Sequence, residues 1–270
     1  MYMILITNSM GDTPAGSPQA LEQPLNYKML GLIVGLIAAF QLSLSFGLAV
    51  PISDRFGTTE LIQLVTPLIP SIFAFLVAGR YWGSEVFGKA YLALGLAYLM
   101  TFIGEIVWNY YVVVLQEEPY PSIADIFFFA WYPFAIYHLV KNSLYFKRRL
   151  DTSTKIWLTM IPIVIVSVYS YLAFESGGLT FDFYYGLIFV AATSVSLSFA
   201  ILGASVFRYS VLKTVWLLLV LGIMINSIAD VWYYYLEIFG QYDEKHVVNS
   251  MWIAGFMIVA YALYKHKKTI

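Results

Sequence analysis

The chain of 270 residues contains no cysteine, which excludes disulfide bonds, thiolate metal sites and cysteine nucleophiles but leaves the redox compartment open. Charged residues are also scarce, at 11% of the sequence, whereas a soluble domain carries about a quarter. Hydrophobic residues make up 60% of the chain and its mean hydropathy is +0.75. A soluble fold of this composition would lack a water-compatible surface. These figures indicate an integral membrane protein.

Recognisable catalytic motifs are absent as well. The sequence has no glycine-rich phosphate loop, no Gly-x-Ser-x-Gly elbow and no His-Glu-x-x-His metal motif. His138 and His246 are expected at opposite ends of parallel spans, and His266 is expected in a basic tail. We therefore expect no shared metal or haem site, and no catalytic residue or cofactor can be named.

Eight apolar stretches follow one another along the chain, each close to the ~20 residues that a bilayer requires. Each is predicted to be a helix, because a lone strand leaves its backbone groups unsatisfied in lipid. The predicted spans are about 29–50, 60–79, 89–115, 122–141, 156–174, 183–207, 211–237 and 247–265. The predicted fold class is an all-α integral membrane protein. Its single polytopic domain, 29–265, is expected between a flexible tail at 1–28 and a short basic tail at 266–270.

The basic residues predict the orientation of these spans. An even number of spans places both termini on one side, and thirteen of the fifteen Lys and Arg residues fall there. Only Arg55 and Lys245 fall on the other side, where the loops are acidic. The positive-inside rule therefore puts both termini in the cytoplasm of a cell-membrane protein whose partner is the lipid bilayer. The basic loop FKRRLDTSTK either contacts anionic lipid or only fixes the orientation.

An internal duplication is indicated by two similar stretches about 124 residues apart. At that shift Trp108 aligns with Trp232 and Asp125 aligns with Asn249, while Glu105 and Asp230 match with one residue of slip. Four helices per half is an even number, so the predicted repeats, about 29–141 and 156–265, are parallel, as in some transporters. The alternative is a coincidence in a chain with 22 Tyr and 20 Phe.

Carboxylates inside apolar spans mark a candidate site, because such a group is costly unless it faces a polar interior. Glu105 and Asn109 are four residues apart and share a helix face, as do Asn226 and Asp230. With the polar residues that begin two other spans, they are expected to surround one cavity reached from outside. The predicted ligand-binding residues are Glu105, Trp108, Asn109, Asp125, Tyr132, Asn226, Asp230, Trp232 and Asn249.

Few basic residues are available in this layer to neutralise the acids. A bound cation, a cationic or polyhydroxylated ligand, or protonated carboxyls are the physical options. Each residue also has a structural interpretation: in that interpretation Asp125 caps its helix together with Ser122. Glu105 and Asp230 would otherwise serve as interhelical hydrogen-bond partners, and aromatic residues near span ends are expected at membrane interfaces.

Residues 119–133, PYPSIADIFFFAWYP, carry a family resemblance. This string, with the preceding Gly104, Glu105 and Trp108, resembles the N-terminal multispan membrane sensory region of bacterial diguanylate cyclases and sensor kinases. The resemblance implies that the membrane region senses a signal and passes it to a cytoplasmic output domain. The sequence has no Gly-Gly-Asp-Glu-Phe signature and no kinase domain. Output is therefore expected through a separate cytoplasmic or membrane signalling partner.

Three functions follow from these features. The first is a stand-alone ligand-binding or sensory module that takes a small molecule or cation in the outer cavity. The second is a small-solute or cation transporter. A transporter should have polar residues in both leaflets, but the cytoplasmic half is expected to consist almost entirely of Leu, Ile, Val, Ala and Phe. The third is an intramembrane lipid-modifying enzyme that uses Glu105, Asp125 or Asp230 as an acid or base. No nucleic-acid partner is expected.

Overall fold

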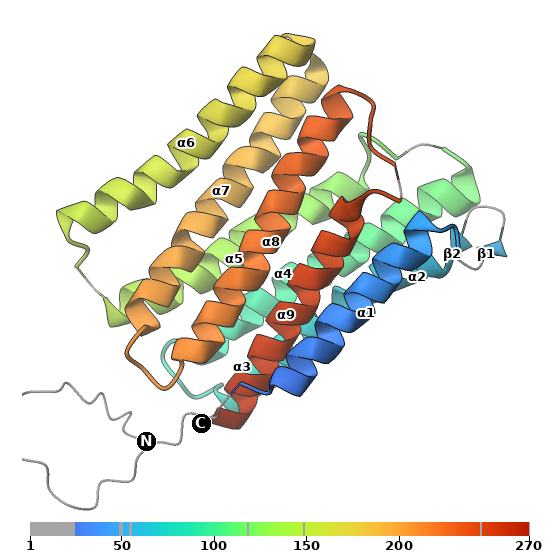
Figure 1. Ribbon diagram of the computed structural model, residues 1–270. Helices are drawn as coiled ribbons and strands as arrows, with labels where there is room; N and C mark the ends of the chain where they lie inside the picture. The colour runs from blue at the N-terminus through green and yellow to red at the C-terminus, as the bar shows by residue number, and fades with distance from the viewer. Residues whose placement is uncertain are drawn as a thin grey trace, which may run out of the picture.

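The computed structural model describes residues 25–48, 51–53, 56–117, 119–147, 149–243 and 245–269. These residues form a bundle of long helices, with one short antiparallel pair, β1 (Pro51–Ser53) and β2 (Phe56–Gly57), beside it (Figure 1). The all-α fold expected from the sequence is thus confirmed. Most of the predicted N-terminal tail, 1–28, lies outside the described residues.

The helices fall close to the predicted spans. Their bounds are α1 (Tyr27–Ser45), α2 (Thr58–Val65), α3 (Leu68–Arg80), α4 (Phe87–Tyr110), α5 (Ala124–Phe146), α6 (Thr152–Gly177), α7 (Phe181–Phe207), α8 (Lys213–Ile238) and α9 (Val247–Thr269). The span predicted at 60–79 is divided into α2 and α3 at Pro67, which has no amide hydrogen to continue a helix. The span predicted at 89–115 ends in a π-helical turn, η1 (Tyr111–Leu115).

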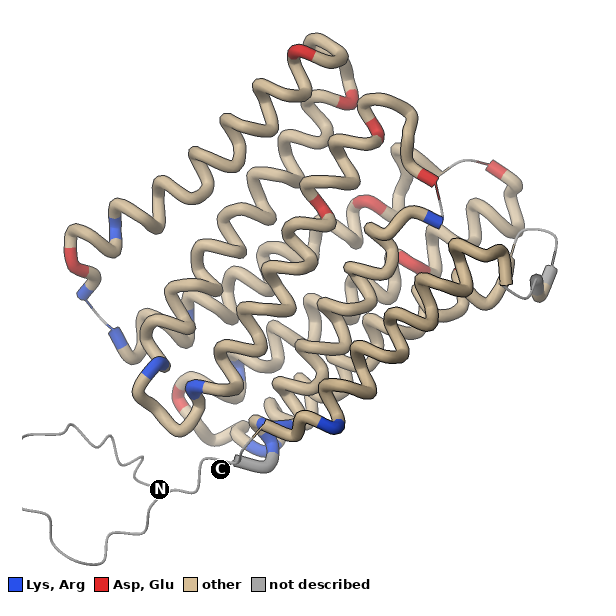
Figure 2. The backbone as a smooth tube through the Cα atoms, in the orientation of Figure 1, with Lys and Arg blue, Asp and Glu red and all other residues tan. Residues whose placement is uncertain are grey.

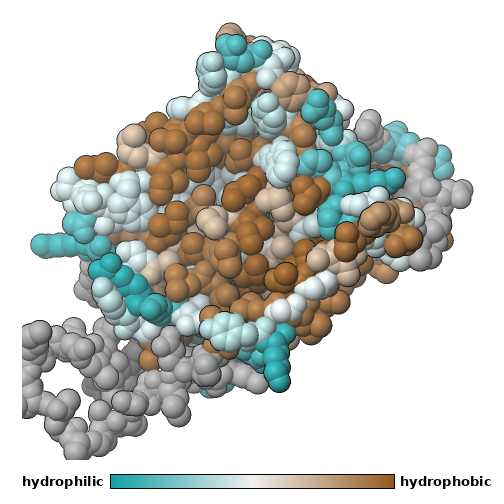
Figure 3. All heavy atoms as spheres, viewed as in Figure 1, coloured by the Kyte–Doolittle hydropathy of each residue, from teal (hydrophilic) through white to brown (hydrophobic). Residues whose placement is uncertain are grey.

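Seven helical segments of the described chain are long and apolar enough to cross a membrane, with α2 and α3 counted as one. The long helix outside this set is α5, whose apolar residues are interrupted by Asp125, His138, Lys141 and Asn142. Hydrophobic side chains also cover much of the flank of the bundle, as Figure 3 shows. Length, composition and surface together support a protein embedded in a lipid bilayer.

Six helices form a closed ring. In order around it, α3 packs against α4, α4 against α5, α5 against α7, α7 against α8, α8 against α9, and α9 against α3. The other two long helices lie outside the ring, α1 against α9 and α6 against α7 and α8 (Figure 1). The apolar core fills the interior of this ring.

Charge separates the two ends of the bundle (Figure 2). Lys and Arg gather where α1 begins and α9 ends, and we call this the basic end. Asp and Glu gather at the opposite, acidic end. The start of α1 is joined to α9 by a hydrogen bond from the Asn26 amide to the Tyr261 hydroxyl, 3.0 Å long. Both ends of the described chain therefore lie at the basic end.

Candidate functional site

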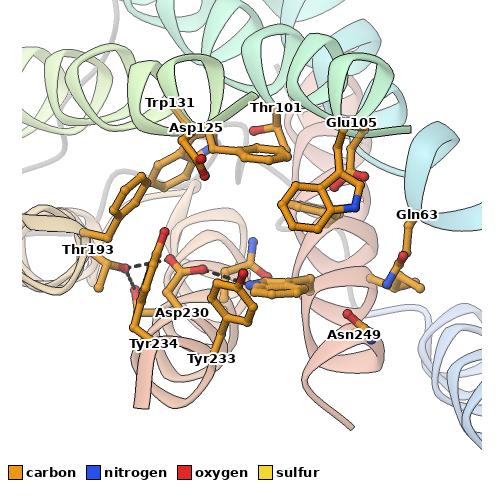
Figure 4. Close-up of a pocket in the computed structure, with 18 of the residues that line it drawn as sticks. Gln63, Thr101, Glu105, Asp125, Trp131, Thr193, Asp230, Tyr233, Tyr234 and Asn249 are labelled. Atoms are coloured by element: carbon orange, nitrogen blue, oxygen red, sulfur yellow. Dashed lines mark hydrogen bonds between the residues drawn. The ribbon is translucent and has the colours of Figure 1, made fainter. Parts of the chain in front are cut away.

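A cavity of about 160 Å³ lies inside the ring, toward the acidic end (Figure 4). It occupies the last turns of α4 and α8 and the first turns of α5 and α9, with α2 and α7 completing its wall. Ten of its twenty lining residues are aromatic, three are acidic and none is basic. The lining residues are Gln63, Thr101, Glu105, Trp108, Asp125, Phe128, Trp131, Tyr132, Phe189, Thr193, Asn226, Ser227, Asp230, Tyr233, Tyr234, Tyr242, Asn249, Trp252, Ile253 and Phe256.

Asp230 on α8 is held by donors from three other helices. The Tyr132 hydroxyl on α5 lies 3.0 Å from Oδ2, and the Thr193 hydroxyl on α7 lies 3.1 Å from the same oxygen. The Trp252 indole N–H on α9 donates to Oδ1 over 2.8 Å, and Figure 4 shows these bonds. All three donors are neutral, so they satisfy the carboxylate without cancelling a negative charge. Asp230 therefore joins four helices at one point.

Glu105 on α4 points into the same cavity from a facing wall (Figure 4). Among the described residues, no side chain or backbone group donates a hydrogen bond to its carboxylate. Asn109, expected to share its site, turns its amide back to the Glu105 carbonyl oxygen at 2.8 Å and does not line the cavity. Asn109 therefore lies outside the lining of the cavity, with its amide bonded to its own helix backbone.

Asp125 stabilises the start of α5 and also lies on the cavity wall. Its Oδ2 accepts the Ser122 N–H at 2.7 Å, and the Ser122 hydroxyl accepts the Ala124 N–H at 3.1 Å. These bonds close the first turn of α5, so the predicted capping interaction with Ser122 is confirmed. The same residue lines the cavity and is 8% exposed.

The two asparagines of the cavity differ in how their side-chain oxygens are satisfied. The side-chain oxygen of Asn249 accepts a 2.9 Å hydrogen bond from the Tyr242 hydroxyl. Asn226 Oδ1 is buried without a partner among the described residues and lies against Gly255, where a Cβ would come within 1.7 Å of it. Gly222 faces Gly255 across the α8–α9 contact, so the two helix backbones approach closely at the floor of the cavity.

Seven of the nine predicted ligand-binding residues line the cavity, and Asn109 and Trp232 do not. Trp232 is 39% exposed and packs edge-on against His246 with ring centroids 5.0 Å apart. It follows Asp230 by two positions, which is about half a turn of helix, so it faces away when Asp230 faces inward.

Sequence reasoning missed several wall residues that carry polar contacts. Thr101 precedes Glu105 by four residues and Trp252 follows Asn249 by three, so same-face spacing could have identified both. Thr193 gives a weaker signal, as one hydroxyl among several in an apolar span. Gln63 lies on α2, and nothing in its sequence context points to the cavity.

A second group of polar side chains is buried near the basic end. His138 on α5 is 1% exposed, and its Nδ1 donates to the Ala90 carbonyl at 3.0 Å. The ring of Tyr91 on α4 lies between His138 and His266, with centroid distances of 4.6 and 4.7 Å. His138 Nε2, the Tyr91 hydroxyl and both nitrogens of His266 have no hydrogen-bond partner among the described residues.

This inner cluster of Tyr91, His138, Asn142 and His266 corrects two expectations. His266 lies within α9 and is fully buried, rather than in an exposed tail. The half of the bundle at the basic end is also not wholly apolar, because interhelical packing gathers polar residues that are far apart in the sequence. In the part of the chain that the structure describes, no group of three His, Asp or Glu side chains could hold a metal ion.

Comparison of the chain with known protein families, with curated proteins and with solved structures finds no match. The fold and the cavity define the class of protein: an all-helical membrane protein with an acidic, aromatic-walled cavity inside a six-helix ring.

Proposed function

We propose that the chain crosses the cell membrane eight times, with both termini in the cytoplasm. The position of α5 inside the ring, between α4 and α7, supports counting it as a span. The gathering of Lys and Arg at the basic end supports a cytoplasmic location for that end (Figure 2). The chain has no native thiol, so single cysteines report the topology directly. Asp243→Cys should react with an impermeant external reagent and Lys147→Cys should not; the reverse pattern would overturn the orientation.

The ring also supports the proposal of two parallel repeats. If α3, α4 and α5 exchange places with α7, α8 and α9, each helix contact of the ring is replaced by another contact of the same ring. Glu105 and Asp230 then occupy corresponding helices, as do Asp125 and Asn249. The outer helices do not follow this relation, because α1 packs against α9 whereas α6 packs against α7 and α8.

The function that the geometry supports best is a ligand-binding or sensory module that takes a small molecule or cation in its outer cavity. The observation that carries this proposal is Glu105, a carboxylate that faces an aromatic cavity without a hydrogen-bond donor among the described residues. Small-molecule sites are typically apolar hollows with a few polar groups that fix orientation. Asp125, from the string that resembles membrane sensory regions, belongs to the same wall. Under this proposal a separate partner carries the output.

Access to the cavity from outside is the first test. Thr101→Cys places a thiol on the cavity wall, and Ser143→Cys places one in the buried half near the basic end. In intact cells or right-side-out vesicles, a small impermeant methanethiosulfonate should modify the first variant and not the second. Modification of Thr101→Cys only after membrane permeabilisation would contradict an outward-facing cavity.

Transport is the second candidate, and the inner cluster favours it. Unpartnered polar atoms of Tyr91, His138, Asn142 and His266 lie between the cavity and the basic end, where a transporter would need hydrophilic groups. Reconstituted vesicles offered labelled tetramethylammonium or glycerol separate the two functions. A sensory module should show no uptake above empty vesicles. Uptake that is lost in His138→Leu would favour the transporter.

A further inference from the structure

The three acids of the cavity differ in the hydrogen bonds that their carboxylates accept. Asp125 accepts a backbone N–H at 2.7 Å and Asp230 accepts three side-chain donors. Glu105 accepts no hydrogen bond from the described residues, and none of the lining residues is basic. A buried carboxylate without a partner is unfavourable, so a molecule that supplies positive charge would be bound at Glu105.

The lining of the cavity distinguishes between kinds of cation. Half of the lining residues are aromatic, including Trp108, Trp131 and Trp252. Aromatic rings attract alkylated ammonium groups through their electron-rich faces, and tryptophan does so most strongly. A metal ion instead requires several oxygen or nitrogen ligands around one point. In the described parts of the chain, no group of three His, Asp or Glu side chains could hold a metal ion.

The size of the cavity limits the ligand further. Its volume is about 160 Å³, close to that of an apolar protein cavity of about 150 Å³ that binds benzene. A trimethylammonium group with a short substituent fits this volume.

We propose that the cavity binds a compact organic ammonium ion, with Glu105 as its counter-ion and the aromatic wall as its cage. This proposal rests on the proposed ligand-binding function and names the chemical class of the ligand. Asp230 positions Tyr132 and Trp252 in the wall, and its charge makes the electrostatic potential in the cavity more negative.

Choline and 3,3-dimethylbutanol provide a matched pair of test compounds, because they share a shape and differ in charge. Their affinities for the detergent-solubilised full chain can be measured from the rise in Tm with concentration. Choline should bind wild type at least about tenfold more tightly than its uncharged isostere. In Glu105→Gln, which keeps the shape and removes the charge, this preference should fall to near unity. Glu117→Gln, an exposed carboxylate outside the cavity wall, should retain it.

The unliganded Tm of Glu105→Gln shows whether the variant is folded. If it is close to wild type and choline is still preferred about tenfold, Glu105 is not the counter-ion and the proposal fails. If glycerol or another neutral polyol raises the Tm and choline does not, the cavity binds ligands but the ammonium class is wrong. If no compound of either class raises the Tm, the ligand-binding function itself is contradicted.

Discussion

Glu105 of the first half of the six-helix ring and Asp230 of the second half both face the cavity, but the two carboxylates are supported differently. In the second half, Asp230 is held by Tyr132, Thr193 and Trp252. In the first half, Glu105 has no donor among the described residues. Two acids at related positions therefore separate into one that organises the wall and one that is available to a ligand.

The helix–helix contacts beside these two acids also differ between the halves. In the second half, α8 and α9 approach through Gly222 and Gly255, where an added Cβ would meet a backbone oxygen 2.8 Å away. In the first half, a Cβ on Gly104 of α4 would meet only the Phe128 ring of α5, at 2.6 Å. A side-chain ring can rotate and a helix backbone cannot, so the α8–α9 contact beside the cavity tolerates an added methyl group less well than the α4–α5 contact does.

Removing each carboxylate should give the largest difference between the halves. Asp230→Ala removes the acceptor of the Tyr132 hydroxyl and of the Trp252 indole N–H, while the Thr193 hydroxyl keeps the Ser227 hydroxyl as a partner at 3.1 Å. Each orphaned donor costs about 1 kcal/mol or more, so the free energy of unfolding should fall by about 2 kcal/mol. Glu105→Ala leaves no donor unpaired and should change it by less than about 1 kcal/mol. Unfolding in mixed micelles with increasing denaturing detergent measures both. Equal losses in the two variants would remove the distinction drawn between the acids.

Adding one methyl group at the helix contacts should give a smaller difference. Gly255→Ala clashes with Asn226 and the α8 backbone and should cost about 1–3 kcal/mol, whereas Gly104→Ala should cost less because Phe128 can move. Gly35→Ala on α1 is the control, since nothing lies within 4 Å of its added Cβ. That variant should be neutral or more stable by up to about 1 kcal/mol. A Gly255→Ala protein as stable as Gly35→Ala would show that the α8–α9 approach is not tight.

The caps of the outer helices should give the smallest difference, and one that depends on pH. Asn26 caps α1 through a 3.2 Å bond from the Met29 amide, while Asp151 caps α6 through a 2.6 Å bond from the Thr154 amide. Hydrogen bonds from Thr154, and then from Lys147, lower the pKa of Asp151 from 3.8 to about 2. The stabilisation of the α6 cap is therefore complete at a pH above 3.8, the ordinary pKa of aspartate, and it is lost as the pH falls through about 2.

Amide hydrogen exchange can follow both helix starts, after correction for intrinsic rates. Protection at the start of α6 should fall between pH 5 and pH 2, while protection at the start of α1 should stay constant over the same interval. Asp151→Asn keeps an acceptor oxygen but cannot titrate, so its α6 protection should no longer depend on pH. A pH-dependent loss that persists in Asp151→Asn would assign the effect to another group.

Helix positions could be predicted from the sequence because lipid demands long apolar segments with all backbone groups bonded internally. The shared cavity of Glu105 and Asp230 followed from their spacing and similar surroundings. The order of helices around the ring could not be predicted, because apolar faces pack against each other with little selectivity. That order brings Thr193 to Asp230 and Tyr91 between His138 and His266.

The surroundings of two predicted site residues could not be derived from helix periodicity alone. Asn109 lies on the expected face of α4, but its amide bonds to a backbone carbonyl of its own helix. Trp232 has an aromatic counterpart in the other half, yet it is rotated away from the cavity and packs against His246. Spacing along a helix predicts a face, and the local hydrogen bonds and neighbours then decide what the side chain contacts.

The polar character of α5 bears on how the chain enters the bilayer during synthesis. A segment interrupted by Asp125, His138 and Asn142 partitions poorly from the translocon into lipid when it is alone. A short connection, residues 116–123, joins it to the preceding helix. Its His138 Nδ1 then bonds to the Ala90 carbonyl of α4. Helices α4 and α5 are therefore suited to insertion as a hairpin. Such a hairpin would complete one wall of the cavity before the ribosome has translated α7, α8 and α9, which form the facing wall.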